Sequence, residues 1–286
     1  MIPLRIPPLR RPAWALALAL LAACTTPPAG RDADGRQLAA AIAGPLRTEA
    51  NRSRDGARHP YETLRAFGLQ PGQTVIEIAP GGGWYTEILA PYLRERGRYI
   101  AALYVEEAAT PAQTEALIAQ ARDRFEARFA RQPEAYGAIA IGTLRPQGLV
   151  GTGEPGSADA VLTFRNIHNW IARDHFDAAL RAFYAALKPG GMLGVEEHRA
   201  APGTPLARII ASGYVPEDYV IEHARAAGFE LASRGEANAN PRDGKEHPNG
   251  VWSLPPTLRG GAADRERFAA IGESDRMTLR FVKPPR

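Results

Sequence analysis

The chain of 286 residues is poor in cysteine, with Cys24 as its only one. A single cysteine excludes a disulfide within the chain and any metal site built from several thiolates. The sequence also lacks a block of like charge, and it has no basic stripe of the kind found in nucleic-acid-binding proteins. We therefore expect no nucleic acid among its partners.

Long apolar runs are scarce as well. The uninterrupted apolar run Ala13–Ala23 is far shorter than the roughly 20 residues needed to cross a bilayer. It follows a basic head with Arg5, Arg10 and Arg11 and ends in small residues, which is typical of an export signal that is removed from the mature protein. We predict a signal peptide over residues 1–23. Its three arginines account for most of the net charge of +4, so the mature chain carries about +1. The neighbours of the two adjacent arginines fit the twin-arginine export pattern poorly.

The end of this segment, LAAC at 21–24, resembles the lipobox of bacterial lipoproteins. The resemblance implies cleavage before Cys24, lipidation of that residue, and attachment of the mature chain to a membrane through the lipid. Thr25 in place of Asp points to the periplasmic side of the outer membrane. Residues 24–33 then form a lipidated, flexible tether. An ordinary cleaved signal with a chance cysteine remains the alternative.

Residues 34–286 are predicted to form one domain. Apolar runs rich in β-branched residues alternate there with segments of helical spacing, which predicts an α/β fold whose mostly parallel sheet carries helices on both faces. The expected helices are Asp34–Leu46, Tyr61–Phe67, Trp84–Arg96, Pro111–Arg131, His175–Leu187 and Pro216–Ala227. The expected strands are Gln73–Ala79, Tyr99–Tyr104, Tyr136–Ile141, Ala158–Phe164, Met192–Glu196, Phe229–Glu236 and Arg276–Val282.

The stretch VIEIAPGGGWYTEIL at 75–89 joins a strand to a helix through three glycines. In open α/β sheets, ligands bind beyond the carboxyl ends of the strands. Glycine permits positive φ and lets a ligand approach the backbone, and a helix N-terminus favours a carboxylate or phosphate. Gly81, Gly82 and Gly83 therefore indicate a ligand site, although a tight turn without a ligand would use the same residues.

Several nucleotide-binding and catalytic motifs are absent. Thr86 stands where a nicotinamide fingerprint needs its last glycine, and the chain has no P-loop, GxSxG or HExxH motif. VIEIAPGGG instead resembles the first motif of class I S-adenosylmethionine-dependent methyltransferases, with Glu77 at the acidic position and Ala79 in place of the first glycine. The cofactor contacts that this resemblance implies are Glu77, Ala79, Pro80, Gly81, Gly82, Gly83 and Trp84.

Further motifs follow in the order of that family. SADAVLTF at 157–164 and LKPGGMLGV at 187–195 resemble its fourth and fifth strands. Together with FRNIHNW and NPRDGKEHPNGVWSLPP, they make the chain similar to a group of exported predicted methyltransferases. The resemblance covers residues 55–235 and extends towards the C-terminus. It implies a Rossmann-like seven-stranded sheet with an antiparallel last strand, and S-adenosyl-L-methionine as the cofactor.

The acid that binds the ribose in this family departs from the usual pattern. That acid commonly ends the second strand, but here Glu106 and Glu107 stand beyond the predicted strand, which ends at Tyr104. Glu106 is expected to reach the ribose if the strand runs long. Two adjacent glutamates are equally ordinary in a solvated loop.

FRNIHNW lies just past the predicted fourth strand, where the methyl donor and acceptor would meet. Arg165 and Asn166 are expected to contact the cofactor, and His168 is a candidate general base for an acceptor that loses a proton. His198 after the fifth strand is the second candidate base. A helix start with an asparagine cap and a structural histidine is the alternative. We expect no metal, because no cysteine is available and the other histidines are scattered.

The sequence thus predicts a lipid-anchored envelope methyltransferase that acts on a small molecule or an envelope component. A non-catalytic envelope protein that binds small molecules with the same fold is the alternative, because S-adenosylmethionine is made in the cytoplasm. The aromatic residues Trp84, Trp170 and Trp252 either line the site or belong to the core. The polar segment 234–261 includes a predicted lid, and the oligomeric state is left open.

Overall fold

The computed structural model describes residues 29–285. The predicted signal peptide and Cys24 therefore lie outside the described residues. The first described helix, α1, begins at Ala29 and ends at Ala43. Its first turn falls inside the segment 24–33 that the sequence predicts as a tether. In the described part of the chain, none of the helices combines the length and the apolar character that crossing a membrane requires.

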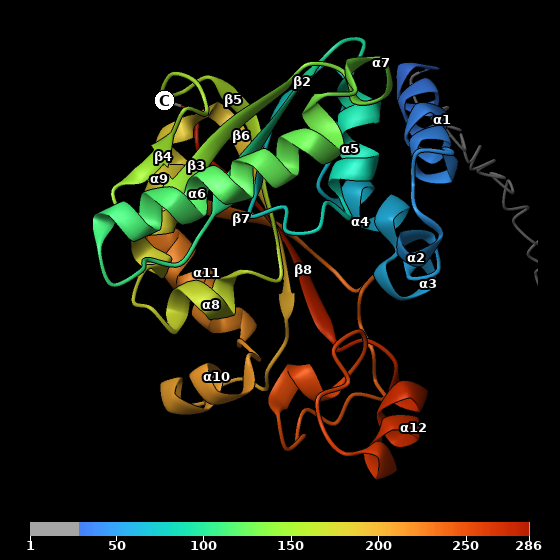
Figure 1. Cartoon of the computed structure of the whole chain (residues 1–286), viewed down its shortest axis with the longest axis vertical. Coiled ribbons are helices and arrows are strands. Elements are labelled where there is room, and N and C mark those ends of the chain that lie inside the picture. Colours follow the sequence, from blue (N-terminus) through green and yellow to red (C-terminus); the bar gives the residue numbers. More distant parts are fainter. Residues whose placement is uncertain (1–28, 286) are drawn as a thin grey trace, which may run out of the picture.

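The core of the fold is one sheet of eight strands in the order β4-β3-β2-β1-β5-β6-β8-β7 (Figure 1). The five strands from β3 to β6 in this order pair in parallel, and β8 runs antiparallel to both β6 and β7. The predicted α/β fold with an antiparallel last strand is confirmed. The strands are β1 (Thr74–Ile78), β2 (Arg98–Tyr104), β3 (Ile139–Arg145), β4 (Gly148–Val150), β5 (Ala158–Phe164), β6 (Leu187–His198), β7 (Glu230–Gly235) and β8 (Arg276–Val282).

The strand count differs from the predicted seven. The additional strand β4 pairs with the end of β3 as a short antiparallel hairpin at the edge of the sheet. β3 runs on to Arg145, past the predicted end at Ile141. A strand of three residues shows no periodicity, so the sequence could not reveal it.

Helices cover both faces of this sheet. On one face, Leu38 of α1, Ile88 of α5 and Phe125 of α6 pack in a common apolar cluster. On the other, Leu180 of α9 and Val220 of α11 belong to a second cluster. The helices are α2 (Glu49–Arg52), α3 (Asp55–Arg58), α4 (Pro60–Ala66), α5 (Thr86–Leu93), α6 (Pro111–Phe125), the π-helix η1 (Glu126–Ala130), α7 (Pro133–Tyr136), α8 (Ile167–Ile171), α9 (Phe176–Ala186), α10 (Leu206–Ser212), α11 (Glu217–Ala226), the 3-10 helix η2 (Gly250–Ser253) and α12 (Ala262–Ile271).

Residues 236–275, between β7 and β8, form what we call the C-terminal lobe. Figure 1 shows its helix α12 together with α10 beyond the end towards which β6 points. Asp243 anchors the lobe: it is buried, accepts hydrogen bonds from the Tyr214 hydroxyl at 2.8 Å and from the Asp275 backbone N–H at 2.8 Å, and contacts Nε2 of His247. The polar segment that includes the predicted lid is therefore held by buried hydrogen bonds at the same end of the sheet as the glycine turn.

Candidate functional site

The glycine turn follows β1, and its backbone is unusual. Ala79, Gly81 and Gly83 have φ angles of 49°, 56° and 78°, in the left-handed region that favours glycine. A Cβ on Gly83 would lie 2.2 Å from the Phe129 ring, whereas a Cβ on Gly82 would meet nothing within 4 Å. Gly83 therefore serves packing, while Gly81 and Gly82 are exposed and leave the backbone open to a ligand.

A cavity of about 710 Å³, which we call the glycine-loop pocket, opens on one side of this turn. Its walls come from the turn, from the end of β2, and from α6 and η1, and its size suits a nucleoside-like ligand. Two aromatic rings, Phe125 and Phe129, give it an apolar wall. Its lining residues are Ala79, Pro80, Gly81, Gly82, Leu103, Tyr104, Val105, Ala121, Arg124, Phe125, Arg128, Phe129 and Asn166.

Glu106 is not among the residues that line this pocket. The strand β2 ends at Tyr104, and the Glu106 carboxylate pairs with Nη2 of Arg173 at 2.5 Å. Both side chains are about half exposed. The structure therefore separates Glu106 from the other predicted cofactor residues, and its role towards the ribose stays a prediction.

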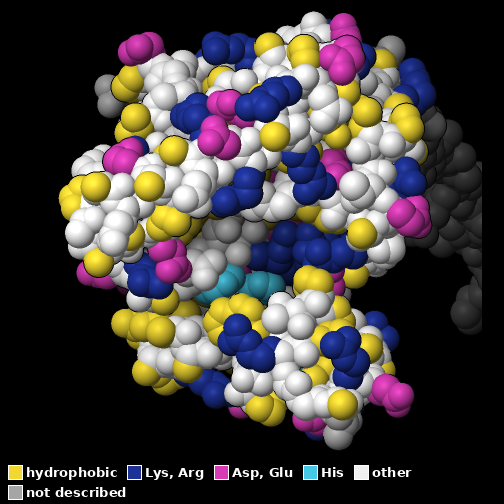
Figure 2. Space-filling view, in the orientation of Figure 1, with side chains coloured by type: hydrophobic (Ala, Val, Ile, Leu, Met, Phe, Trp, Pro, Cys, Tyr) yellow, Lys and Arg dark blue, Asp and Glu magenta, His cyan; other side chains and the backbone are white. Residues whose placement is uncertain are grey.

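A second cavity of about 300 Å³, which we call the arginine pocket, lies on the other side of the turn. It shares Ala79, Pro80, Gly81, Gly82 and Asn166 with the glycine-loop pocket. Figure 2 shows a hollow on this face, in which Lys and Arg side chains lie next to His side chains. The residues found only in the arginine pocket are Asn51, Arg54, Arg58, Glu77, Trp84, Tyr85, Phe164 and Arg165.

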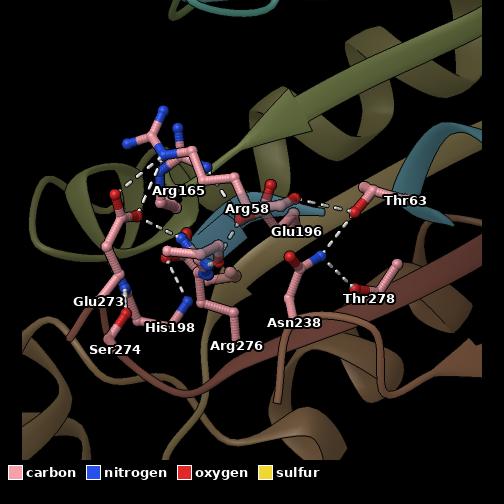
Figure 3. A network of polar contacts seen from close by, with 12 residues as sticks. Arg58, Thr63, Arg165, Glu196, His198, Asn238, Glu273, Ser274, Arg276 and Thr278 are labelled. Carbon is pink, nitrogen blue, oxygen red and sulfur yellow. Dashed lines mark hydrogen bonds and ion pairs between the residues drawn. The ribbon is translucent and has the colours of Figure 1, made fainter. Parts of the chain in front are cut away.

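Buried ion pairs hold the arginines of this pocket (Figure 3). Glu273 accepts hydrogen bonds from Nε of Arg54 at 2.8 Å, Nε of Arg58 at 3.1 Å and Nη1 of Arg276 at 2.7 Å. Glu196 accepts from Nη1 of Arg165 at 2.9 Å, and its Oε1 lies 3.1 Å from Nε of Arg276. Burial raises the pKa of Glu273, but the surrounding arginines outweigh burial and lower it to about 2.

Sequence reasoning missed most of this network. Arg58 and Glu273 lie 215 positions apart, and neither belongs to a recognisable local motif. They come into contact only because the fold packs α3, which precedes β1, against the residues just before β8. A long-range ion pair leaves no signal in one sequence.

Trp84 belongs to the arginine pocket and not to the glycine-loop pocket. Its Nε1 donates to the backbone carbonyl of Asn51 at 2.9 Å. The guanidinium groups of Arg47 and Arg58 lie 4.9 and 4.8 Å from its ring centroid, a distance typical of cation–π contacts. Trp84 therefore orients arginines, and the predicted contact with a cofactor stays untested.

Glu77 is almost completely buried and lines the arginine pocket. Its Oε2 accepts hydrogen bonds from the Tyr99 hydroxyl at 2.6 Å and the Thr86 hydroxyl at 3.1 Å. Burial raises the pKa of Glu77 to about 7, against the effect of these hydrogen bonds. The carboxyl group is therefore divided between its neutral and its ionised form near pH 7.

Arg165 and Asn166 join the two cavities at the end of β5. Arg165 has a φ of 59°, a strained value for a residue other than glycine, of the kind that gathers at functional sites. The Asn166 amide donates to the Ile78 carbonyl at 3.1 Å and to Oγ1 of Thr163 at 3.3 Å. The amide therefore ties the end of β5 to the end of β1 and lines both pockets.

The two predicted bases, His168 and His198, lie together at the ends of β5 and β6, with ring centroids 5.3 Å apart. Nδ1 of His168 lies 3.0 Å from Oε1 of Glu197, and Nδ1 of His198 lies 2.5 Å from Oγ of Ser274. Burial, and after it the nearby His168 and Arg165, hold the pKa of His198 well below its usual range. His198 is therefore a weak base, and the geometry favours His168.

Sequence reasoning did not assign a role to Glu197, which directly precedes His198. Each of its oxygens has two partners: Oε2 accepts from the backbone N–H groups of Ile167 and His168, and Oε1 from Nδ1 of His168 and the backbone N–H of His198. Such a carboxylate orients its neighbours.

The ligand atoms of His168, Glu197 and His198 all lie within 4.8 Å of one another, a spacing that could hold a metal ion. The Glu197 carboxylate, however, already accepts from four N–H groups. A metal would have to displace some of these hydrogen bonds, so the cluster fits a hydrogen-bonded base better than a ligand set. The expected absence of a metal stays a prediction.

Comparisons with other proteins agree on the fold. No protein-family model matches the sequence, and no curated protein is similar to it in sequence. Among solved structures, a SAM-dependent methyltransferase from Aquifex aeolicus is 14% identical, with a TM-score of 0.52 over 81% of this chain and 93% of that one. The [4+2]-cyclase SpnF is 20% identical, with a TM-score of 0.50 over 90% of this chain and 95% of that one. The chain thus has the mixed α/β, Rossmann-like fold of methyltransferases.

Proposed function

We propose that the protein is an S-adenosylmethionine-dependent methyltransferase of the bacterial envelope. The observation that carries this proposal is the meeting of two cavities at Gly81, Gly82 and Asn166. One has the size and apolar wall suited to a nucleoside. The other is polar and offers space for an acceptor, and His168 follows two residues after Asn166, which lines both cavities. Two substrates held on either side of one open backbone turn would be aligned for group transfer.

The residues that line the glycine-loop pocket fit the proposed cofactor. The backbone of Gly81 and Gly82 is open to close approach, and Tyr104, Phe125 and Phe129 offer rings beside a base. When bound, S-adenosylmethionine supplies a methyl group on an electrophilic sulfonium. The protein's contribution is to orient the two reactants, exclude water and remove a proton where the acceptor has one to lose.

His168 is the group that would remove that proton. Its Nδ1–H donates to Glu197, which leaves Nε2 free to accept a proton. The four hydrogen bonds to Glu197 fix the direction of the imidazole ring. His198, whose pKa is lowered, stays neutral beside it and adds no competing charge.

The proposed location rests on the sequence. The apolar run Ala13–Ala23 and the LAAC sequence at 21–24 support export and lipidation at Cys24. The acceptor would then be a small molecule or a component of the envelope, and the lipid would hold the enzyme on the periplasmic side of the outer membrane.

One observation favours the alternative, a non-catalytic protein that binds a small molecule. The carboxylate of Glu106 is engaged with Arg173 and does not line the glycine-loop pocket. A cofactor would then lack the acid that holds its ribose. The similarity of the fold to a protein named as a [4+2]-cyclase also means that the fold alone does not select methyl transfer.

Calorimetric titration of the purified protein with S-adenosylmethionine and S-adenosylhomocysteine tests the proposal. Binding of both ligands, together with methyl transfer to acceptors from an envelope extract, is the expected result. Binding without transfer to any acceptor would favour the non-catalytic alternative. Failure of both ligands to bind would contradict the cofactor assignment. Glu106→Gln should weaken binding only if this residue turns towards the ribose, and Glu107→Gln is the matched control.

A further inference from the structure

We propose that the arginine pocket binds a negatively charged group of the methyl acceptor, a carboxylate or a phosphate. This inference rests on the proposed function and adds the chemical class of the acceptor. It starts from three arginines, Arg54, Arg58 and Arg165, which line one cavity next to the glycine turn.

Unused hydrogen-bond donors in the pocket are the first argument. Arg58 donates through Nε to Glu273 and lies with its guanidinium over the Trp84 ring. In the described part of the chain, neither of its terminal nitrogens has a hydrogen-bond partner, and Arg165 uses only Nη1, towards Glu196. The two arginines therefore keep pairs of N–H groups free, in the arrangement that recognises carboxylate and phosphate oxygens.

The pocket is also rigid. Glu273 and Glu196 are almost completely buried, and they hold Arg58 and Arg165 by hydrogen bonds of 3.1 and 2.9 Å (Figure 3). Trp84, itself buried, limits the rotation of the Arg58 guanidinium. An anion entering such a pocket finds its donors in place and loses little affinity to the ordering of side chains.

The charges of the network do not cancel. Four arginines, Arg54, Arg58, Arg165 and Arg276, are paired with only two carboxylates, Glu196 and Glu273. Two positive charges therefore remain in excess. Burial, followed by repulsion from Arg165, lowers the pKa of Arg58 to about 9. The nearby Glu77 is neutral for part of the population near pH 7 because burial raises its pKa to about 7. A bound anion would offset this excess.

The cofactor as a whole adds no net negative charge to offset this excess. S-adenosylmethionine carries a carboxylate, an ammonium and a sulfonium group, so its net charge is positive. Its binding would add to the positive charge near the pocket. An acceptor with a carboxylate or phosphate would offset the charge and lie beside Gly82 and Asn166, which both cavities share.

Calorimetric titration of the purified full chain with inorganic phosphate, at constant ionic strength, tests the inference. The titration is made with the protein alone and with saturating S-adenosylhomocysteine. Simultaneous binding of both ligands is expected, because they would occupy different cavities. Mutual exclusion would instead assign the arginines to the carboxylate of the cofactor and would overturn the inference.

Three substitutions locate the phosphate. Arg165→Gln and Arg58→Gln should each weaken phosphate binding about 10- to 100-fold, the range for the loss of hydrogen bonds to a charged group. Arg225→Gln, on the exposed surface of α11, removes the same charge away from both cavities and should leave phosphate binding unchanged. Equal phosphate affinities in all three variants and the parent would overturn the inference.

Separate experimental controls detect a loss of folding and a failure of the proposed function. Thermal unfolding identifies a variant that has lost its structure, and Arg54→Gln, whose side chain is 25% exposed, replaces Arg58→Gln if that variant unfolds. Binding of S-adenosylhomocysteine without phosphate binding would overturn this inference and leave the proposed function standing. Phosphate binding without S-adenosylhomocysteine binding would leave an anion site but contradict the proposed function, and with it the identity of the anion as an acceptor group.

Discussion

His168 and Glu197 form a buried hydrogen-bonded pair across the ends of β5 and β6. Nδ1 of His168 lies 3.0 Å from Oε1 of Glu197, and the two side chains are 7% and 0% exposed. The pairing with an ionised carboxylate keeps the proton on Nδ1, so Nε2 is the atom that can accept a proton. The pair therefore identifies Nε2 of His168 as the atom that would act as the predicted base, and Glu197 as the residue that positions it.

Removing the base should lower turnover. His168→Asn is expected to reduce the rate about 10²- to 10⁴-fold while leaving the binding of S-adenosylhomocysteine nearly unchanged, because His168 does not line the glycine-loop pocket. The rates of the parent and of the variant are measured against pH. A flat pH profile together with a normal rate of the variant would exclude the base and would point to an acceptor that is already a good nucleophile.

Glu197→Gln should give a smaller loss than His168→Asn and shift the pH profile of the remaining activity. The reason is that an amide holds the imidazole less firmly and can stabilise the wrong tautomer. A purely structural role would lower the amount of folded protein without moving the pH profile. Turnover is therefore measured against pH and normalised to the folded fraction from unfolding curves, with His198→Asn as a comparison.

Two glycines of the turn have different expected roles: Gly83 serves packing, and Gly82 leaves the backbone open to a ligand. Gly83→Ala should destabilise the protein by about 1–3 kcal/mol, because its Cβ would clash with Phe129 at 2.2 Å. Gly82→Ala should leave stability within about 0.5 kcal/mol, since a Cβ there meets nothing within 4 Å. Gly82→Ala should nevertheless weaken S-adenosylhomocysteine binding about tenfold, a change of about 1.4 kcal/mol.

Urea unfolding and calorimetry on the two variants check this difference. The expected pattern is a stability loss without a specific binding loss for Gly83→Ala, and the reverse for Gly82→Ala. Normal ligand affinity in a folded Gly82→Ala protein would show that no ligand approaches the backbone at this position.

Glu77 should make stability depend on pH. Burial raises the pKa of its carboxyl from 4.5 to about 7, so the unfolded chain ionises this group at lower pH than the folded chain does. The group's contribution to stability is complete below about pH 4.5 and is lost as the pH rises to about 7. The total change is about 3 kcal/mol.

Glu77→Gln cannot ionise and should lack this part of the pH dependence. Free energies of unfolding are measured for the parent and the variant at several pH values between 4 and 8. The variant is expected to gain stability relative to the parent as the pH rises. Parallel curves over that range would mean that the Glu77 carboxyl ionises normally in the folded protein.

The proposed lipid anchor is tested at Cys24. Cys24→Ser should release the protein into the soluble periplasmic fraction or leave the signal uncleaved, because serine cannot carry the thioether-linked lipid. Cell fractionation and mass spectrometry of the mature N-terminus provide the measurement, with Thr26→Ser as the control. A processed Cys24→Ser protein that stays in the membrane fraction would refute the lipoprotein assignment.

The sequence by itself determined the longer helices and strands and their order. Apolar runs and helical spacing depend on neighbours a few residues apart, so β1, β5, the glycine turn and the final strand could be recognised locally. β8 has the bounds Arg276–Val282 that the sequence predicted. The position of His168 and His198 at one edge also followed, because parallel strands end on the same side of a sheet.

Only the tertiary structure decided which side chains meet. Glu106, the expected ribose acid, pairs with Arg173 and does not line the glycine-loop pocket, and its role towards the ribose stays a prediction. Arg58 and Glu273, 215 positions apart, became partners through the packing of the N-terminal segment on the end of β8. Side-chain contacts between distant segments depend on how whole elements pack, and no local pattern in one sequence encodes them.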